Sequence, residues 1–224
     1  MNLKTLFCGL ILLSFISCKK SSSTAAEPDK YMTTTATSSW NYQQTNNAGA
    51  APVVTNYTIT STSRDTTINS KSYHIYSNSA GANQFYNITS HDYYQFDSLP
   101  GGLSGGNIER LYLKDDQAVG FSWTQNLSVN IPGIPIPIPV TLTNSITEKG
   151  ISRTVNGVVY NDVIHVSTSI SSALIPAANL TSSINNYYAR KYGQIESSTI
   201  VNLNFSGFVQ NVNVQTKLMS ATLH

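Results

Sequence analysis

Apolar and polar residues alternate over many short stretches of this chain, and this period of two constrains the fold more than any other feature. Residues 118–123 read Ala-Val-Gly-Phe-Ser-Trp, and residues 201–205 read Val-Asn-Leu-Asn-Phe. Such alternation is typical of β-strands that bury one face. The pairs Asn69-Ser70, Asn156-Gly157 and Ser206-Gly207 favour tight turns. Because so little chain separates successive strands, crossover helices have no room, and an antiparallel sheet is expected.

The predicted fold class is therefore all-β: an antiparallel meander of about 10–12 strands that forms a strongly curved sheet, a half-barrel or a barrel. A weak internal repeat indicates two similar halves, residues 53–139 and 140–224, because the segment Thr67–Tyr73 resembles the segment Thr154–Tyr160. Two unrelated hairpins of similar composition would give the same likeness, since hairpins reuse Asn-centred turns.

The first 17 residues have the organisation of an export signal. Lys4 precedes an apolar run at residues 6–15, which is about half as long as a membrane-spanning helix requires. Residues 15–18, Phe-Ile-Ser-Cys, resemble the lipobox of bacterial lipoproteins, and the Lys- and Ser-rich run 19–23 is similar to that of lipoproteins from the Bacteroidota. The resemblance implies cleavage after residue 17 and a place in the cell envelope, at the periplasmic face of the outer membrane or, as the alternative, exposed at the cell surface. The alternative is an ordinary secretory signal that happens to end in cysteine.

The same resemblance implies that Cys18 carries the lipid that attaches the protein to the membrane. The other cysteine, Cys8, lies within the signal, so the mature chain would hold one thiol and no disulfide. Two or three acyl chains on Cys18 would give stable attachment. Residues 18–38 are then the lipidated cysteine and a flexible, Ser/Thr-rich tether, and residues 39–224 form a single β-domain.

The composition limits the partners that the domain can bind. Charged residues make up 11% of the chain, against about 25% in typical soluble proteins. Lys and Arg form no patch that would bind nucleic acid. A neutral surface rich in Ser, Thr, Asn and Tyr suits an envelope protein that meets lipid, glycan or protein.

The segment 131–140 alternates Ile and Pro. Because proline has no N–H to donate, this segment is expected at a sheet edge, in a protruding hairpin or in a polyproline-like ribbon. One interpretation is a hairpin tip that proline protects against edge-to-edge aggregation. The other is an apolar flap, with Ile134 and Ile136 covering a ligand cavity or contacting a membrane or partner.

Two function classes follow for the domain. The first is a non-enzymatic binding module, in which a curved sheet holds an apolar or lipid-like ligand against Tyr94, Phe121, Trp123 and Tyr188. The second is a structural or adhesive lipoprotein with a filled interior, whose surface contacts glycan or another envelope protein.

No catalytic, metal or cofactor site is expected. Asp162, His165 and Ser167 have the composition of a catalytic triad, but side chains alternate between the two faces of a strand, so Asp162 should point away from His165. The four histidines lack the spacing of a zinc site. The Gly-rich run 101–106 leads into a predicted strand and so lacks the helix N-terminus that cradles phosphate.

Overall fold

The computed structural model of the protein describes residues 30–99, 106–131 and 134–224. These residues form twelve strands and no helix, which confirms the all-β prediction. The strands are β1 (Ser39–Asn46), β2 (Val53–Ile68), β3 (Lys71–Asn78), β4 (Gln84–Thr89), β5 (Asp92–Asp97), β6 (Ile108–Lys114), β7 (Ser122–Val129), β8 (Ile138–Val155), β9 (Val158–Ser171), β10 (Leu180–Ala189), β11 (Gly193–Phe205) and β12 (Phe208–Thr222). A search of the described residues finds no helix with the length and hydropathy needed to span a membrane.

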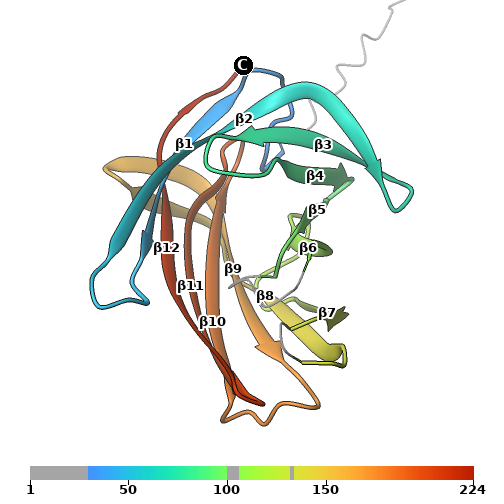
Figure 1. The fold of residues 1–224 in the computed structure, drawn as a ribbon. Helices are drawn as coiled ribbons and strands as arrows, with labels where there is room; N and C mark the ends of the chain where they lie inside the picture. Colours follow the sequence, from blue (N-terminus) through green and yellow to red (C-terminus); the bar gives the residue numbers. More distant parts are fainter. Residues whose placement is uncertain (1–29, 100–105, 132–133) are drawn as a thin grey trace, which may run out of the picture.

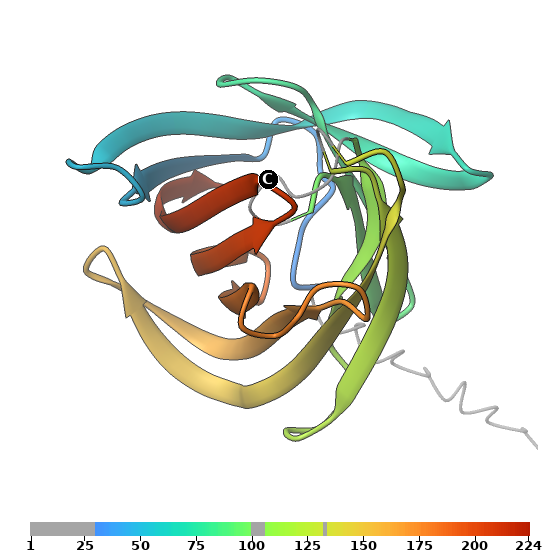
Figure 2. The ribbon, with the colours of Figure 1, turned by 60° about the horizontal axis from the view of Figure 1, so that its bottom comes forward.

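All twelve strands belong to one antiparallel sheet in the order β6-β5-β4-β3-β2-β1-β12-β11-β10-β9-β8-β7. Consecutive strands are neighbours except at β6 and β7, and the first strand pairs with the last along Ser39–Asn46. The sheet curls on itself into a nearly closed, barrel-shaped meander (Figures 1 and 2). The predicted meander of antiparallel strands is thus confirmed.

The gap between β6 and β7, here called the seam, is bridged by side chains of β7. The main-chain N–H of Leu111 on β6 donates to Gln125 Oε1 at 2.8 Å, and the indole N–H of Trp123 donates to Leu111 O at 3.0 Å. These two bonds satisfy main-chain groups of Leu111 that would otherwise lack a strand partner. Trp123 therefore helps to close the barrel-shaped sheet.

Tight turns with positive backbone φ angles join the long hairpins. Asn69 and Ser70 have φ of 48° and 65°, and Asn156 and Gly157 have φ of 49° and 78°, the conformation that two-residue hairpin turns favour. The register around both turns is the same, since Thr66 pairs with Tyr73 and Arg153 pairs with Tyr160. The two segments of the proposed repeat are therefore matching hairpins, and an internal duplication stays a prediction.

Three clusters of buried side chains fill the interior. The first is aliphatic and includes Ile138, Leu142 and Ile184, the second surrounds Trp40, and the third surrounds Trp123. The Ile-Pro segment contributes to the first cluster, because Ile131 and Ile138 are 3% and 0% exposed.

Pro139 lies near the start of β8, opposite Ser128 of β7. Pairing of β8 with β9 begins only at Thr141, two residues further on. Pro139 is thus at a place where β8 has a strand on one side only, as proline requires.

Residues 30–38 pack against the sheet, although the sequence places them in the tether. Tyr31 is 1% exposed, and its main-chain N–H donates to the hydroxyl of Tyr93 at 3.1 Å. Its own hydroxyl donates to Asp162 Oδ1 at 3.0 Å. The buried, hydrogen-bonded side chain of Tyr31 packs this segment against the sheet, so residues 30–38 belong to the fold rather than to the tether expected from the sequence. Cys18 and the signal lie outside the described residues.

Candidate functional site

A cavity of about 490 Å³ lies inside the barrel-shaped sheet, where the three core clusters meet. Leu142 and Ile184 of the first cluster, Trp40 of the second and Tyr188 of the third all line it. Its volume falls within the range of about 300–1,000 Å³ that is usual for small-molecule sites.

Five of the described tyrosines line the cavity, and their rings contact one another as a pair and as a group of three. Tyr42 stacks on Tyr57 with ring centroids 5.4 Å apart, and Tyr112 lies 5.9 Å from Tyr86 and 5.3 Å from Tyr188. Burial raises the pKa of Tyr42, Tyr86, Tyr112 and Tyr188 well above the ordinary value. Their hydroxyls therefore stay protonated and can both donate and accept hydrogen bonds.

Amide side chains supply much of the remaining polar lining, and most of them bond to one another or to tyrosine. Gln95 Nε2 donates to the hydroxyl of Tyr86 at 2.9 Å, which donates to Gln84 Oε1 at 2.9 Å. Gln194 Nε2 donates to Asn186 Oδ1 at 2.9 Å. Half of the described lining residues have polar or charged side chains other than tyrosine: Gln44, Gln84, Gln95, Asp97, Ser98, Arg110, Gln125, Asn144, Thr168, Asn186, Gln194, Ser197, Thr199 and Thr216.

Two charged residues, Arg110 and Asp97, line the cavity. Arg110 Nη2 donates to Gln95 Oε1 at 2.8 Å. Asp97 Oδ1 accepts from the main-chain N–H of Ser98 at 2.7 Å, and Oδ2 accepts from Gln95 Nε2 at 3.4 Å. The ion pairs of the described residues include neither Arg110 nor Asp97. Gln95 therefore lies between two charges that do not neutralise each other directly.

Three buried side-chain nitrogens have no hydrogen-bond partner among the described residues: Trp40 Nε1, Arg110 Nε and Asn144 Nδ2. All three residues line the cavity, and all three atoms are donors. Asn144 uses only its oxygen, which accepts from Thr168 Oγ1 at 2.7 Å. Since buried polar groups in native proteins are almost always paired, these donors indicate that the cavity receives hydrogen-bond acceptors.

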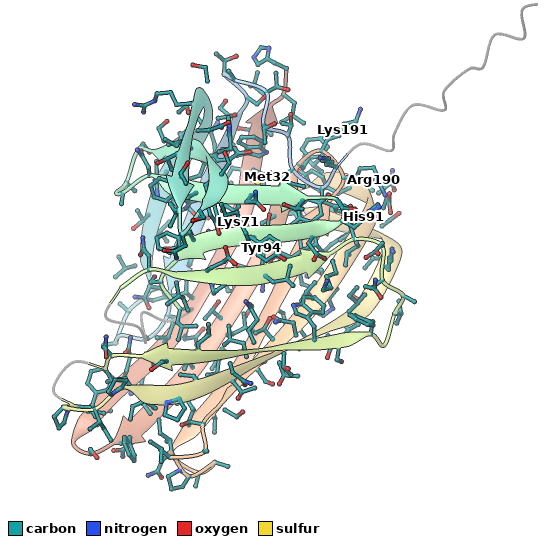
Figure 3. The ribbon with its side chains drawn as sticks, turned by 90° about the vertical axis from the view of Figure 1, so that its right-hand side faces the viewer. Met32, Lys71, His91, Tyr94, Arg190 and Lys191 are labelled. Carbon is teal, nitrogen blue, oxygen red and sulfur yellow. The ribbon has the colours of Figure 1, made fainter. Side chains whose placement is uncertain are left out.

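The structure brings one of the residues singled out in the sequence, Tyr188, to the cavity. Tyr94 does not line it, because its neighbour Gln95 points inward and alternation turns Tyr94 the other way. Figure 3 shows Tyr94 beside Lys71, whose Nζ lies 3.6 Å from the centre of the Tyr94 ring.

Phe121 and Trp123 lie together, with ring centroids 6.3 Å apart, but neither lines the cavity. Phe121 is 39% exposed and precedes β7 in a turn at Gly120, whose φ is 91°. Ile134 packs against the first core cluster, and Ile136 is 56% exposed. The expected aromatic wall and apolar flap therefore do not meet at one site.

The triad-like residues of β9 contact different partners. Asp162 accepts from Arg190 Nε at 2.5 Å and from Tyr31, whereas His165 contacts Glu148 Oε2 at 3.1 Å and stacks on Tyr187 with ring centroids 4.1 Å apart.

Over the described ranges, no group of three or more His, Cys, Asp and Glu side chains could hold a metal ion.

Comparison with known proteins gives two similar folds. A candidate lipoprotein from Parabacteroides distasonis ATCC 8503 has a TM-score of 0.46 and 10% sequence identity, over 88% of this chain and 100% of its own. A candidate exported protein with a YmcC-like fold from Bacteroides fragilis NCTC 9343 has a TM-score of 0.47 and 8% identity, over 87% of this chain and 99% of its own. No protein-family model and no curated protein sequence matches the chain.

Proposed function

We propose that this chain is a lipid-anchored protein of the bacterial cell envelope whose barrel-shaped domain binds a polar small molecule without transforming it. The lipid anchor rests on the lipobox-like residues 15–18 and on Cys18 as the only cysteine beyond the export signal. The proposed location is the periplasmic face of the outer membrane. The binding function rests on the cavity.

The polarity of the cavity lining is the observation that supports a polar ligand. An apolar or lipid-like ligand, the expectation from sequence, would remove water from the amide, hydroxyl and charged groups of the cavity without replacing their hydrogen bonds. Each buried polar group left unpaired in this way costs about 1–3 kcal/mol. A ligand with hydroxyl, amide or carboxylate groups would pair with them instead, while its nonpolar faces could pack against the tyrosine rings.

Mass spectrometry of the full-length protein purified from its native membrane under mild conditions tests this function. The wild-type protein is expected to release a polar small molecule. In the variant Thr199→Trp, a large side chain enters the cavity from β11, so the molecule should be absent.

The matched control is Ile200→Trp, because Ile200 is the next residue on the same strand and is 39% exposed. This variant should retain the molecule. The binding function would be contradicted if the wild-type protein released no small molecule and a stably folded Thr199→Trp variant gave the same mass-spectrometric result. The structural or adhesive lipoprotein would then be the better proposal.

A further inference from the structure

Among the described residues, Arg110 is the one guanidinium that lines the cavity, and its neighbours use only part of its hydrogen-bonding capacity. It lies on β6 opposite Gln95 of β5. Of its five N–H donors, one on Nη2 reaches Gln95, while the buried Nε has no partner. The guanidinium edge formed by Nε and a terminal nitrogen is the edge that a carboxylate binds through two parallel hydrogen bonds.

We propose that Arg110 recognises a carboxylate group of the ligand in this cavity. The inference rests on the proposed binding function and adds the chemical class of the molecule: a polar compound with one carboxylate near Arg110 and further acceptor atoms for Trp40 and Asn144. These three residues belong to β6, β1 and β8, so the acceptors are spread over a ligand that spans the interior.

The charges of the cavity favour a carboxylate over a phosphate. Arg110 is the only cation among the described lining residues, and Asp97 adds a negative charge to the same cavity. Arg110 matches the single negative charge of a carboxylate, whereas the second charge of a phosphate dianion would be left uncompensated in a cavity that also holds Asp97. Asp97 is already held by the N–H of Ser98 and the amide of Gln95, so it is not the partner that Arg110 lacks.

Two further observations support an acidic ligand: the reach of the Arg110 charge into the cavity, and the kind of atoms that are left unpaired there. Its electrostatic effect reaches Tyr188, where burial raises the pKa of the phenol and Arg110 opposes that rise. The unpaired buried side-chain atoms in the described ranges are all nitrogen donors, and none is an oxygen acceptor. The described residues therefore offer an excess of hydrogen-bond donors, of which Arg110 is the charged one, and these complement the acceptor oxygens of a carboxylate.

Nuclear magnetic resonance of the 15N-labelled full-length protein gives a direct readout. The side-chain N–H signals of Trp40, Trp123 and Arg110 are recorded during titration with three pairs of probes: acetate and acetamide, a glucuronic-acid-containing disaccharide and its neutral counterpart, and glycylglycine and glycylglycinamide. Trp123 serves as an internal control, because its indole N–H already donates to Leu111. The variants Trp123→Phe and Arg110→Lys assign the signals.

The expected result is that the carboxylate member of a pair shifts the Arg110 Nε–H signal, while the uncharged member binds at least about 30-fold more weakly. Arg110→Gln should weaken binding of the carboxylate by the same factor, with the thermal unfolding midpoint confirming the fold. The exposed Arg64 provides the matched control, since Arg64→Gln removes a positive charge away from the cavity. A shift with the acidic sugar or with the dipeptide decides between a saccharide and a peptide ligand.

Equal binding of both members of each pair, or carboxylate binding that survives Arg110→Gln, would overturn the carboxylate inference. So would a co-purified molecule without a carboxylate, in which case the binding function itself stands. If no probe shifts Arg110 or Trp40 and no molecule co-purifies, the cavity holds water only, and both proposals fail.

Discussion

Tyr31 provides a sharp test of where the folded domain begins. Tyr31→Phe removes the hydrogen bond to Asp162 but keeps the ring. A hydrogen bond to a charged group contributes about 1.5–3 kcal/mol, and the 43% exposure of the Asp162 side chain places this one at the lower end. Tyr31→Ala also deletes a buried ring that contacts Tyr93, for which large-to-small changes cost about 3–5 kcal/mol.

A change of 1 kcal/mol shifts the unfolding midpoint of a domain of this size by about 2–4 °C. We therefore expect a decrease of about 3–6 °C for Tyr31→Phe and, with the ring also lost, of about 9–26 °C for Tyr31→Ala. Thermal unfolding followed by circular dichroism measures both. Tyr94→Phe is the matched control, because the Tyr94 hydroxyl makes only a 3.4 Å contact with Asp92. An unchanged midpoint for Tyr31→Ala would show that residues 30–38 belong to the tether after all.

Three further predictions concern the anchor, the Asp162 ion pair and the seam. Cys18→Ser should release the protein into the soluble fraction without changing its unfolding midpoint; continued membrane attachment would refute the lipid anchor. Burial acts to raise the pKa of Asp162, but hydrogen bonds from Arg190 and Tyr31 together with the Arg190 charge lower it below the ordinary value. A depressed acid pKa stabilises the fold above the unfolded-state value of about 3.9, and this contribution is lost as the pH falls through the lower folded-state value. In the variant Asp162→Asn, the free energy of unfolding measured with urea should depend less on pH in that acidic range than in the wild type. A pH profile identical to that of the wild type would argue against the ion pair. Gln125→Leu should lower the free energy of unfolding by about 1–3 kcal/mol, because the Leu111 N–H loses its acceptor; faster amide exchange at Leu111 would locate the effect, and unchanged exchange would contradict it.

The strands and hairpins could be predicted because their signals are local. The alternation at residues 201–205 and the turn pairs Asn156-Gly157 and Ser206-Gly207 each act over a few residues. Pairing of β1 with β12 joins residues at opposite ends of the chain, and no short pattern encodes such a contact. The seam at β6 and β7 could not be predicted for the same reason.

The cavity residues escaped prediction because polar side chains inside a barrel resemble polar side chains outside it. Gln95 and Arg110 occupy inward positions of β5 and β6. The alternating sequence pattern nevertheless predicts that polar side chains such as these face the solvent. Trp123 was expected to touch a ligand and instead packs in the third cluster at the seam. Tyr31 lies within the Ser/Thr-rich stretch 18–38, and the composition of that stretch predicts a tether although it contains one aromatic residue.

Pairing of the first strand with the last also affects when the protein can fold. Ser39 pairs with Thr222 and Asn46 with Val214, whereas every other strand pair joins consecutive strands. This one pair must therefore close a loop of more than 160 residues, which makes it the slowest pair to form. A chain emerging from a ribosome has no β12 to offer β1 until all eleven preceding strands have been made. The unfinished chain therefore stays without its central strand pair. The local hairpins can form before this point, but the barrel-shaped sheet can be completed only after β12 has been made.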